Sequence, residues 1–226
     1  MEIQKKIKEI NKIIESTAVE ANRNPEEIKL LAVSKRQSIQ KIIDAYDAGQ
    51  KDFGENFVQE GLSKIKEMRR LNITWHFIGH LQNNKTRDVA EHFDWIHTVD
   101  NIKTIQRLND QRPESLRPLN VCLQIKIDNE ASKFGMDAAE LNELVSFSSE
   151  LKRISLRGLM CLPALRAEFN EQRKPFKTLK SLADKLRENG FNIDTLSMGM
   201  SGDYRAAIFE GSTIVRLGTT IFGQRQ

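Results

Sequence analysis

Eight short strand-like runs alternate with amphipathic helical patterns along this chain, and this alternation is the strongest constraint on its fold. The runs cover residues 28–34, 51–54, 73–78, 95–99, 119–127, 155–161, 194–197 and 212–217. Between them, apolar residues recur at steps of three and four, as in Leu179, Leu182 and Leu186. Eight such units in about 200 residues predict an α/β fold of the (β/α)8 TIM-barrel type.

An extra helix is predicted before the first strand. Its apolar face is formed by residues three or four apart, namely Ile3, Ile7, Ile10, Ile14, Ala18 and Ala21. Asn24 followed by Pro25 ends this helix. Farther along, Asp137 and Glu140 have the spacing of a capping box, which would open the helix after the fifth strand.

A doubly wound sheet is the alternative fold. Such sheets usually carry a glycine-rich turn after the first strand, whereas residues 34–38 read Ser-Lys-Arg-Gln-Ser. No linker rich in proline, glycine or serine divides the chain, so residues 1–226 are predicted to form one domain.

The charge balance argues against a nucleic-acid partner. The chain has 35 basic and 31 acidic residues, a net charge of +4, and its short basic runs fit solvated helix faces. Cys122 and Cys161 lie in apolar runs and are expected to be buried thiols. The N-terminus is charged, so no secretory signal is expected, and no apolar stretch is long enough to predict a membrane span. A cytoplasmic protein is therefore predicted.

Lys35 follows the first strand, which is almost entirely apolar. In a parallel barrel the carboxyl ends of all strands gather at one face, so Lys35 would stand at that mouth. Apolar walls around its stem would favour the neutral amine, which can form a Schiff base with a carbonyl. An ordinary surface lysine at a strand end is the alternative.

The segment 197–203, Ser-Met-Gly-Met-Ser-Gly-Asp, follows the seventh strand and leads into a helix near Asp203. Backbone N–H groups at such a place bind phosphate well, and barrels typically use the loops after strands seven and eight. Gly218 and Thr219, after the eighth strand, would form the second half of the site. A simple capped helix is the alternative. Arg216, in the eighth strand, is expected to point into the barrel, toward a ligand or a carboxylate.

Two further side chains are candidates for the same mouth. Asn56 follows Gly54 and Glu55 at the end of the second strand, and His80 follows Gly79 after the third. His76 alternates with Phe77 in the third strand, so the two histidines need not face the same way. A turn with a helix cap and a satisfied histidine are the alternatives.

Six motifs, in order, resemble the pyridoxal phosphate homeostasis proteins, which are similar to the N-terminal barrel of alanine racemase. They are LLAVSK at 30–35, FGENFVQE at 53–60, WHFIGHLQNNK at 75–85, GLM at 158–160, LSMGMS at 196–201, and VRLGT at 215–219, continued by IFG at 221–223. The resemblance runs from about residue 3 to the C-terminus. It implies a single-domain barrel that binds pyridoxal 5′-phosphate as an internal aldimine with Lys35.

The resemblance also implies roles for individual residues. Phosphate contacts fall on Met200, Ser201, Gly218 and Thr219, and the arginine beside the pyridine nitrogen on Arg216. Asn56 and His80 match positions that line the same mouth. Residues 129–135 resemble the family's loop after strand five, in which Lys133 is the matching lysine. Gly202 departs from the bulkier or acidic residue common in the family, which affects the loop conformation alone.

The resemblance leaves two functions open. One is a carrier that holds the cofactor for vitamin B6 homeostasis and delivers it to apo-enzymes, and the other is an amino-acid racemase. A two-base racemase needs a second proton donor opposite the lysine, which the similar racemases take from a second domain that this chain is expected to lack. Tyr46 and Tyr204 are its two tyrosines, and neither is placed for that role. Arg216 would leave the pyridine nitrogen unprotonated. A monomeric, essentially non-catalytic carrier is therefore predicted.

Overall fold

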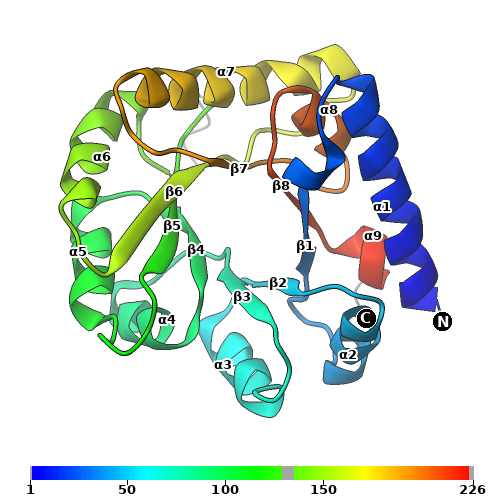
Figure 1. The fold of residues 1–226 in the computed structure, drawn as a ribbon, viewed down its shortest axis with the longest axis horizontal. Coiled ribbons are helices and arrows are strands. Elements are labelled where there is room, and N and C mark those ends of the chain that lie inside the picture. Colours follow the sequence, from blue (N-terminus) through cyan, green and yellow to red (C-terminus); the bar gives the residue numbers. More distant parts are fainter. Residues whose placement is uncertain (1, 129–134, 224–226) are drawn as a thin grey trace.

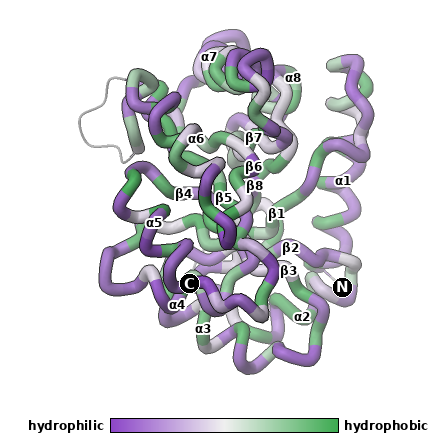
Figure 2. The backbone as a smooth tube through the Cα atoms, turned by 60° about the vertical axis from the view of Figure 1, so that its left-hand side comes forward, coloured by the Kyte–Doolittle hydropathy of each residue, from purple (hydrophilic) through white to green (hydrophobic). Residues whose placement is uncertain are grey.

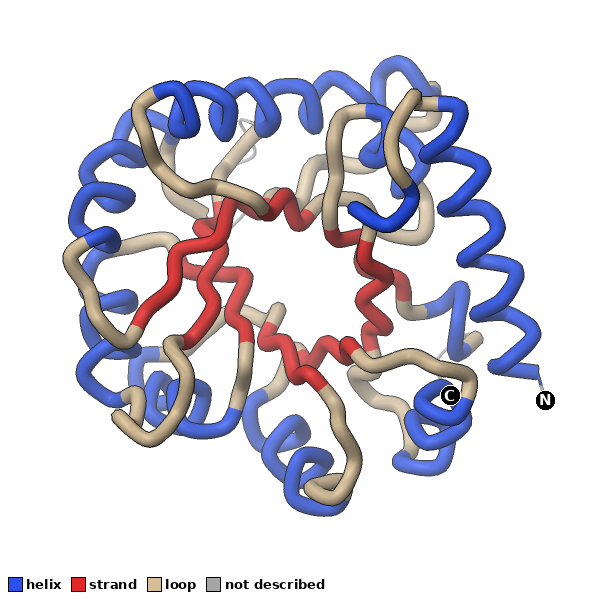
Figure 3. Tube along the Cα trace, in the orientation of Figure 1, coloured by secondary structure: helices blue, strands red, loops and turns tan. Residues whose placement is uncertain are grey.

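The computed structural model describes residues 2–128 and 135–223. Eight parallel strands close into a barrel in sequence order, with helices around the outside (Figures 1 and 3). The strands are β1 (Lys29–Val33), β2 (Asp52–Glu55), β3 (Thr74–Phe77), β4 (Trp95–Val99), β5 (Leu119–Gln124), β6 (Ile154–Met160), β7 (Thr195–Ser197) and β8 (Ile214–Leu217). The predicted (β/α)8 fold is confirmed, and the doubly wound sheet is excluded because β8 pairs with β1.

A helix follows each strand. These are α2 (Ile39–Asp47), α3 (Val58–Glu67), α4 (Thr86–His92), α5 (Ile102–Gln111), α6 (Leu141–Ser149), α7 (Phe169–Glu188), α8 (Tyr204–Phe209) and α9 (Thr219–Phe222). The run predicted at 119–127 leaves the barrel early. Beyond Gln124, Ile125 forms an isolated bridge with Met136 instead of continuing β5.

The predicted N-terminal helix is present as α1 (Glu2–Glu20). Its apolar face buries Ile3, Ile7, Ile10 and Ile14. Each such burial is worth about 1.5–3 kcal/mol. Helix α1 packs on α2, α8 and α9, so it covers the place where the last β/α unit meets the first (Figure 1).

The main apolar core lies between the strands and the surrounding helices. Along the helices, hydrophobic and hydrophilic residues alternate, as expected where one face packs on the barrel (Figure 2). A second, smaller cluster contains Trp95, Cys122 and Met160. Beside it the barrel interior is unusually polar, with His76, His97 and Arg216 all buried.

The glycine of the GLM motif allows two strands to approach each other. A Cβ at Gly158 would lie 1.7 Å from the carbonyl oxygen of Thr195, at the start of β7. A side chain at Gly158 would therefore force β6 and β7 apart.

The predicted capping box at Asp137 is wrong. Asp137 does stand at an N-cap position, but its side chain makes no capping hydrogen bond. The N–H of Glu140 donates to the backbone carbonyl of Asp137 at 3.1 Å, which closes a 3₁₀ turn at Ala138–Glu140. That turn occupies the N–H that a capping box would use, and α6 begins only at Leu141.

Candidate functional site

Lys35 lies two residues beyond the end of β1, in a tight turn. The N–H of Gln37 donates to the carbonyl oxygen of Ser34 at 3.0 Å, which closes the turn around Lys35. Arg36 has a φ of 58°, a left-handed conformation that is uncommon for residues other than glycine. Lys35 itself is half-buried. The turn therefore places its side chain at the carboxyl end of the barrel strands.

The loops after β7 and β8 meet each other at the same end. The hydroxyl of Thr219 donates to that of Ser201 at 3.3 Å. The N–H of Met200 donates to Asp203 Oδ1 at 2.6 Å, and burial raises the pKa of that carboxyl. A Cβ at Gly218 would lie 3.2 Å from the carbonyl oxygen of Val33, so this loop adjoins the end of β1.

Arg216 points into the barrel, as the sequence predicted. Its side chain is buried, and it donates to the hydroxyl of Ser197 at 2.7 Å and to the carbonyl oxygen of Cys161 at 2.9 Å. These two neutral acceptors replace the carboxylate that the sequence suggested as a protein partner. The guanidinium is thus held in a defined orientation at the level of the β7 and β8 ends.

A chain of buried polar groups continues from Arg216 across the barrel interior. Ser197 Oγ lies 2.7 Å from His97 Nδ1, and His97 Nε2 lies 2.9 Å from His76 Nδ1. His76 Nε2 lies 3.0 Å from Asp52 Oδ1, which also accepts from Lys29 at 2.9 Å. We call these residues, from Arg216 to Asp52, the barrel chain.

The Asp52 end of the barrel chain determines the direction of its hydrogen bonds when both imidazoles are neutral. The Asp52 carboxylate can only accept, so His76 carries its proton on Nε2. His76 Nδ1 then accepts from His97 Nε2–H, and His97 Nδ1 accepts from the Ser197 hydroxyl. Ser197 also accepts from Arg216, because arginine can only donate. This pattern makes both neutral histidines Nε2–H tautomers.

The electrostatics agree with these neutral forms. Burial lowers the pKa of His97 well below its ordinary value, and the neighbouring His76 and Arg216 add to that effect. Burial also lowers the pKa of His76, although Asp52 opposes it. Trp95 stacks on His76 with ring centroids 5.4 Å apart, which helps to exclude water from the pair.

Asn56 and His80 are brought together in a groove of about 450 Å³ between the loops after β2 and β3. His80 is exposed, whereas His76 is fully buried, so the two histidines face differently, as predicted. A Cβ at Gly79 would lie 1.9 Å from the carbonyl oxygen of Asn56, which shows how closely the two loops pack. The side-chain oxygen of Asn56 is buried and finds no hydrogen-bond partner within the described part of the protein.

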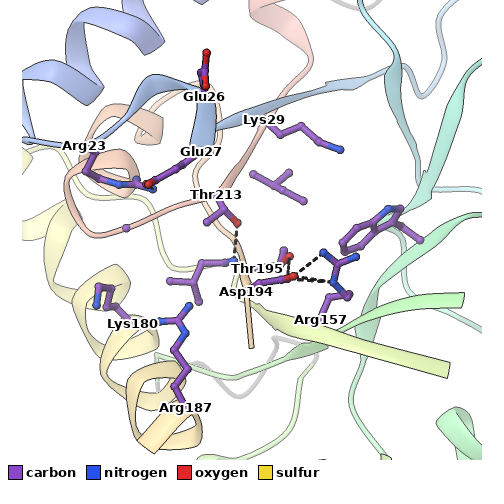
Figure 4. Close-up of a pocket in the computed structure, with 14 residues that line it drawn as sticks. Arg23, Glu26, Glu27, Lys29, Arg157, Lys180, Arg187, Asp194, Thr195 and Thr213 are labelled. Atoms are coloured by element: carbon purple, nitrogen blue, oxygen red, sulfur yellow. Dashed lines mark hydrogen bonds and ion pairs between the residues drawn. The ribbon is translucent and has the colours of Figure 1, made fainter. Parts of the chain in front are cut away.

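A larger cavity, of about 570 Å³, lies at the opposite end of the barrel, where the strands begin (Figure 4). Four of its charged side chains pair with one another. Arg157 bonds to Asp194 at 2.6 Å, and Arg23 contacts Glu27 at 3.5 Å. Since catalytic and binding groups of barrels gather at the carboxyl ends of the strands, the mouth near Lys35 is the stronger candidate despite its smaller groove.

Metal or thiol chemistry has little support. Across residues 2–128 and 135–223, no group of three or more His, Cys, Asp and Glu side chains is arranged to hold a metal ion. Cys122 and Cys161 are buried thiols outside any disulfide, as predicted, and burial raises the pKa of the Cys122 thiol to about 12. No helix in the described ranges is long and apolar enough to cross a membrane.

The structure thus gathers the predicted residues on five neighbouring strands. The ends of β7 and β8 carry Met200, Ser201, Arg216, Gly218 and Thr219, the end of β1 leads to Lys35, and those of β2 and β3 lead to Asn56 and His80. Lys133 lies outside the described residues. Sequence reasoning missed Ser197 as a partner of Arg216 and His97 as a partner of Ser197. Polar residues within apolar strands were a usable signal for buried polar positions, but not for which of them pair.

Comparison with known proteins agrees with this arrangement. The family model for the alanine racemase N-terminal domain matches residues 13–226. Pyridoxal phosphate homeostasis proteins of Escherichia coli K12 and Vibrio alginolyticus are 52% and 49% identical to this chain. The two matches cover 94% and 99% of this chain, and 92% and 97% of the respective relatives.

Solved structures give the same answer. PipY of Synechococcus elongatus, described with pyridoxal phosphate (PLP) bound, is 39% identical, with a TM-score of 0.83 over 93% of this chain and 100% of PipY. An alanine racemase of Clostridium difficile shares the fold, with a TM-score of 0.74 at 18% identity, over 99% of this chain and 56% of the racemase. The chain belongs to the alanine racemase N-terminal domain family and, within it, to the pyridoxal phosphate homeostasis proteins.

Proposed function

We propose that the protein binds pyridoxal 5′-phosphate at the carboxyl-terminal mouth of its barrel and serves as a carrier in vitamin B6 homeostasis. The observation that carries this proposal is the placement of three kinds of group on the neighbouring strands β7, β8 and β1. These are the Ser201–Thr219 hydroxyl pair, the buried guanidinium of Arg216 and the turn that presents Lys35. The homologous PipY, with its bound cofactor, supports the same assignment.

The residues present fit this cofactor. Hydroxyls and backbone groups of Met200, Ser201, Gly218 and Thr219 would hold the phosphate, and Arg216 would donate to the pyridine nitrogen. The buried oxygen of Asn56 offers an acceptor that the described protein leaves unused. His80 lines the same groove as Asn56 and would border the entrance.

Lys35 would hold the cofactor covalently. The cofactor supplies an electrophilic aldehyde when bound. The amine of Lys35, in its neutral form, would add to that aldehyde carbon and give a C=N bond, with release of one water molecule. The tight turn at residues 34–37 restricts the backbone on both sides of Lys35, so the point from which its side chain extends is fixed before the ligand arrives.

A titration of apo-protein with pyridoxal 5′-phosphate tests the function and the phosphate site together. We expect saturable binding, with a yellow absorbance band that borohydride reduction removes. Ser201→Ala should weaken affinity about 10-fold or more, because a charge-assisted hydrogen bond contributes about 1.5–3 kcal/mol. The thermal stability of the apo-protein should stay unchanged, since Ser201 is exposed.

Ser181→Ala is the matched control, because Ser181 is an exposed serine in the outer helix α7. Its affinity should equal that of the unmodified protein. Absence of any reducible band would overturn the proposed covalent attachment. Equal affinities in both serine variants would instead show that the phosphate binds elsewhere.

The geometry favours a carrier over a racemase. The Tyr46 hydroxyl accepts from the N–H of Asn72, which precedes β3, so it lies toward the end of the barrel where strands begin. Tyr204 is buried at the start of α8. We infer that neither serves as a proton donor opposite Lys35.

We therefore expect cofactor-saturated protein to show no appreciable racemisation of alanine, so that α-hydrogen exchange is slow for at least one of the two enantiomers. Loss of one proton-transfer partner costs on the order of 10²–10⁴-fold in rate for at least one enantiomer. The measurement is deuterium incorporation from heavy water, followed by NMR. Rapid exchange from both faces that disappears in Lys35→Ala would make the protein an enzyme and would refute the carrier assignment.

A carrier of the cofactor needs proteins that receive it. We propose that apo-enzymes that use pyridoxal phosphate take it from a monomeric, cytoplasmic carrier, without a nucleic-acid or membrane partner. The near-balanced charge supports the absence of a nucleic-acid role.

A further inference from the structure

A buried cluster of charged groups lies beside the Lys35 turn, outside the proposed cofactor contacts. Its centre is the ammonium of Lys64, from helix α3, whose side chain is only 6% exposed. The ammonium donates to Glu55 Oε1 at 2.8 Å and to Glu60 Oε1 at 2.6 Å. A third donation, at 2.7 Å, goes to the backbone carbonyl oxygen of Ser34. All three of its hydrogens are thereby used.

The cluster forms hydrogen bonds with the backbone on both sides of Lys35. Before Lys35, the carbonyl of Ser34 accepts from Lys64, and the Ser34 hydroxyl donates to Glu55 Oε1 at 2.6 Å. After Lys35, the N–H of Arg36 donates to Glu60 Oε1 at 2.5 Å. The peptide groups on either side of Lys35 are therefore both hydrogen-bonded to the same cluster of charged side chains.

Burying the charged groups of this cluster costs free energy, which argues that the cluster has a function other than stability. The side chain of Glu55 is fully buried, its second oxygen has no hydrogen-bond partner in the described protein, and burial raises its pKa. Buried ion pairs rarely add stability compared with apolar packing of the same volume. The cluster also holds Arg36 in its left-handed conformation, which a non-glycine residue adopts at a cost.

We infer that Lys64 and Glu60, supported by Glu55, are positioning residues that fix the Ser34–Arg36 backbone so that the Lys35 amine meets the cofactor aldehyde. This inference rests on the proposed function. It concerns how fast Lys35 forms the imine and leaves recognition of the phosphate and ring to other residues. Small displacements of a reacting group reduce rates strongly, so a loosened turn should slow the reaction.

The test separates covalent attachment from recognition. Pyridoxine 5′-phosphate has the ring and phosphate but an alcohol in place of the aldehyde, so it measures recognition alone. Its affinity, from calorimetry, is compared with the rate of imine formation from pyridoxal 5′-phosphate, from stopped-flow absorbance. The variants are Lys64→Met and Glu60→Ala. Glu60→Gln keeps an acceptor for Arg36, and Lys66→Met removes an exposed lysine from the same helix.

We expect imine formation to slow at least fivefold in Lys64→Met and Glu60→Ala, and by less than that in Glu60→Gln and Lys66→Met. The affinity for pyridoxine 5′-phosphate should stay within threefold in all four. Slowing of less than fivefold in Glu60→Ala, or an equal loss of pyridoxine 5′-phosphate affinity, would overturn the inference.

Two further outcomes are distinguishable. If Lys64→Met does not fold, the comparison of Glu60→Ala with Glu60→Gln decides. Both should fold, because the side chain of Glu60 is 26% exposed and its loss leaves the Lys64–Glu55 pair intact. If the unmodified protein forms no imine, the proposed function fails and the inference falls with it. If it does form one, and Glu60→Ala reacts equally fast, the inference alone fails.

Discussion

Replacement of Lys35 with alanine is expected to remove the reducible yellow band of the cofactor-loaded protein completely while leaving the barrel folded. The reason is chemical, because no other group at this position can form a C=N bond with the aldehyde. The fold should survive, since Lys35 lies in a turn beyond β1 and is only half-buried. Phosphate contacts should remain, so the variant should still bind pyridoxine 5′-phosphate.

The measurement combines absorbance with mass spectrometry after borohydride reduction. Lys85→Ala is the matched control, because Lys85 borders the groove that holds Asn56 and His80 at the same mouth. It should keep the band and the labelled Lys35 peptide. A reducible band at full occupancy in Lys35→Ala would mean that another lysine carries the bond, and Lys133 would be the first to examine.

The barrel could be predicted from the sequence because the patterns that identify its strands and helices lie within short segments of the chain. Each strand is a short apolar run, and each helix repeats apolar residues at steps of three and four, so the order of elements follows from the chain alone. Burial of the Arg216 charge is costly in either direction unless it is paired, and the inward direction was predicted because a ligand or a carboxylate could pair with it there. The assignment of Lys35, Ser201 and the other site residues to cofactor contacts stays a prediction, as does the single domain.

Contacts between distant segments could not be predicted in this way. The barrel chain joins His76, His97 and Ser197 from three different strands, and no local pattern marks them as partners. The Lys64 cluster is hidden for the same reason, because Lys64 reads as one more charge on an amphipathic helix. The capping box failed at a finer level, where a backbone carbonyl competed successfully for the N–H of Glu140.

The barrel chain is expected to make the folded protein sensitive to acid. His76 and His97 are fully buried, and burial lowers the pKa of both. The unfolded chain protonates its histidines near pH 6.5, roughly, whereas the folded barrel keeps these two neutral. Their contribution to stability is therefore present above about pH 6.5 and is lost as the pH falls.

The expected loss is large for a single site. Each histidine that stays neutral in the folded state costs about 1.4 kcal/mol per pH unit below its unfolded pKa. Glu55 and Asp203 act in the opposite direction, because burial raises the pKa of both carboxyls and their protonation favours the folded state as the pH falls. Variants at single histidines are needed to separate these contributions.

We expect His97→Gln to lower the free energy of unfolding at pH 7.5 but to flatten its decline by about 1.4 kcal/mol per pH unit between about pH 6 and 5. A glutamine amide can accept from the Ser197 hydroxyl and donate to His76, yet it takes up no proton. His92→Gln, at the exposed end of α4, is the control and should keep the steep decline. Urea unfolding at several pH values gives the free energy of unfolding of the unmodified protein and of both variants.

Parallel declines in His97→Gln and the unmodified protein would mean that His97 takes up its proton inside the folded barrel. A protonated imidazole has no acceptor left for the Ser197 hydroxyl. Ser197 would then face two donors, Arg216 on one side and His97 on the other, with its own hydrogen unplaced. That outcome would refute the neutral form assigned to His97 over this pH range, and with it the hydrogen bond from Ser197 to His97.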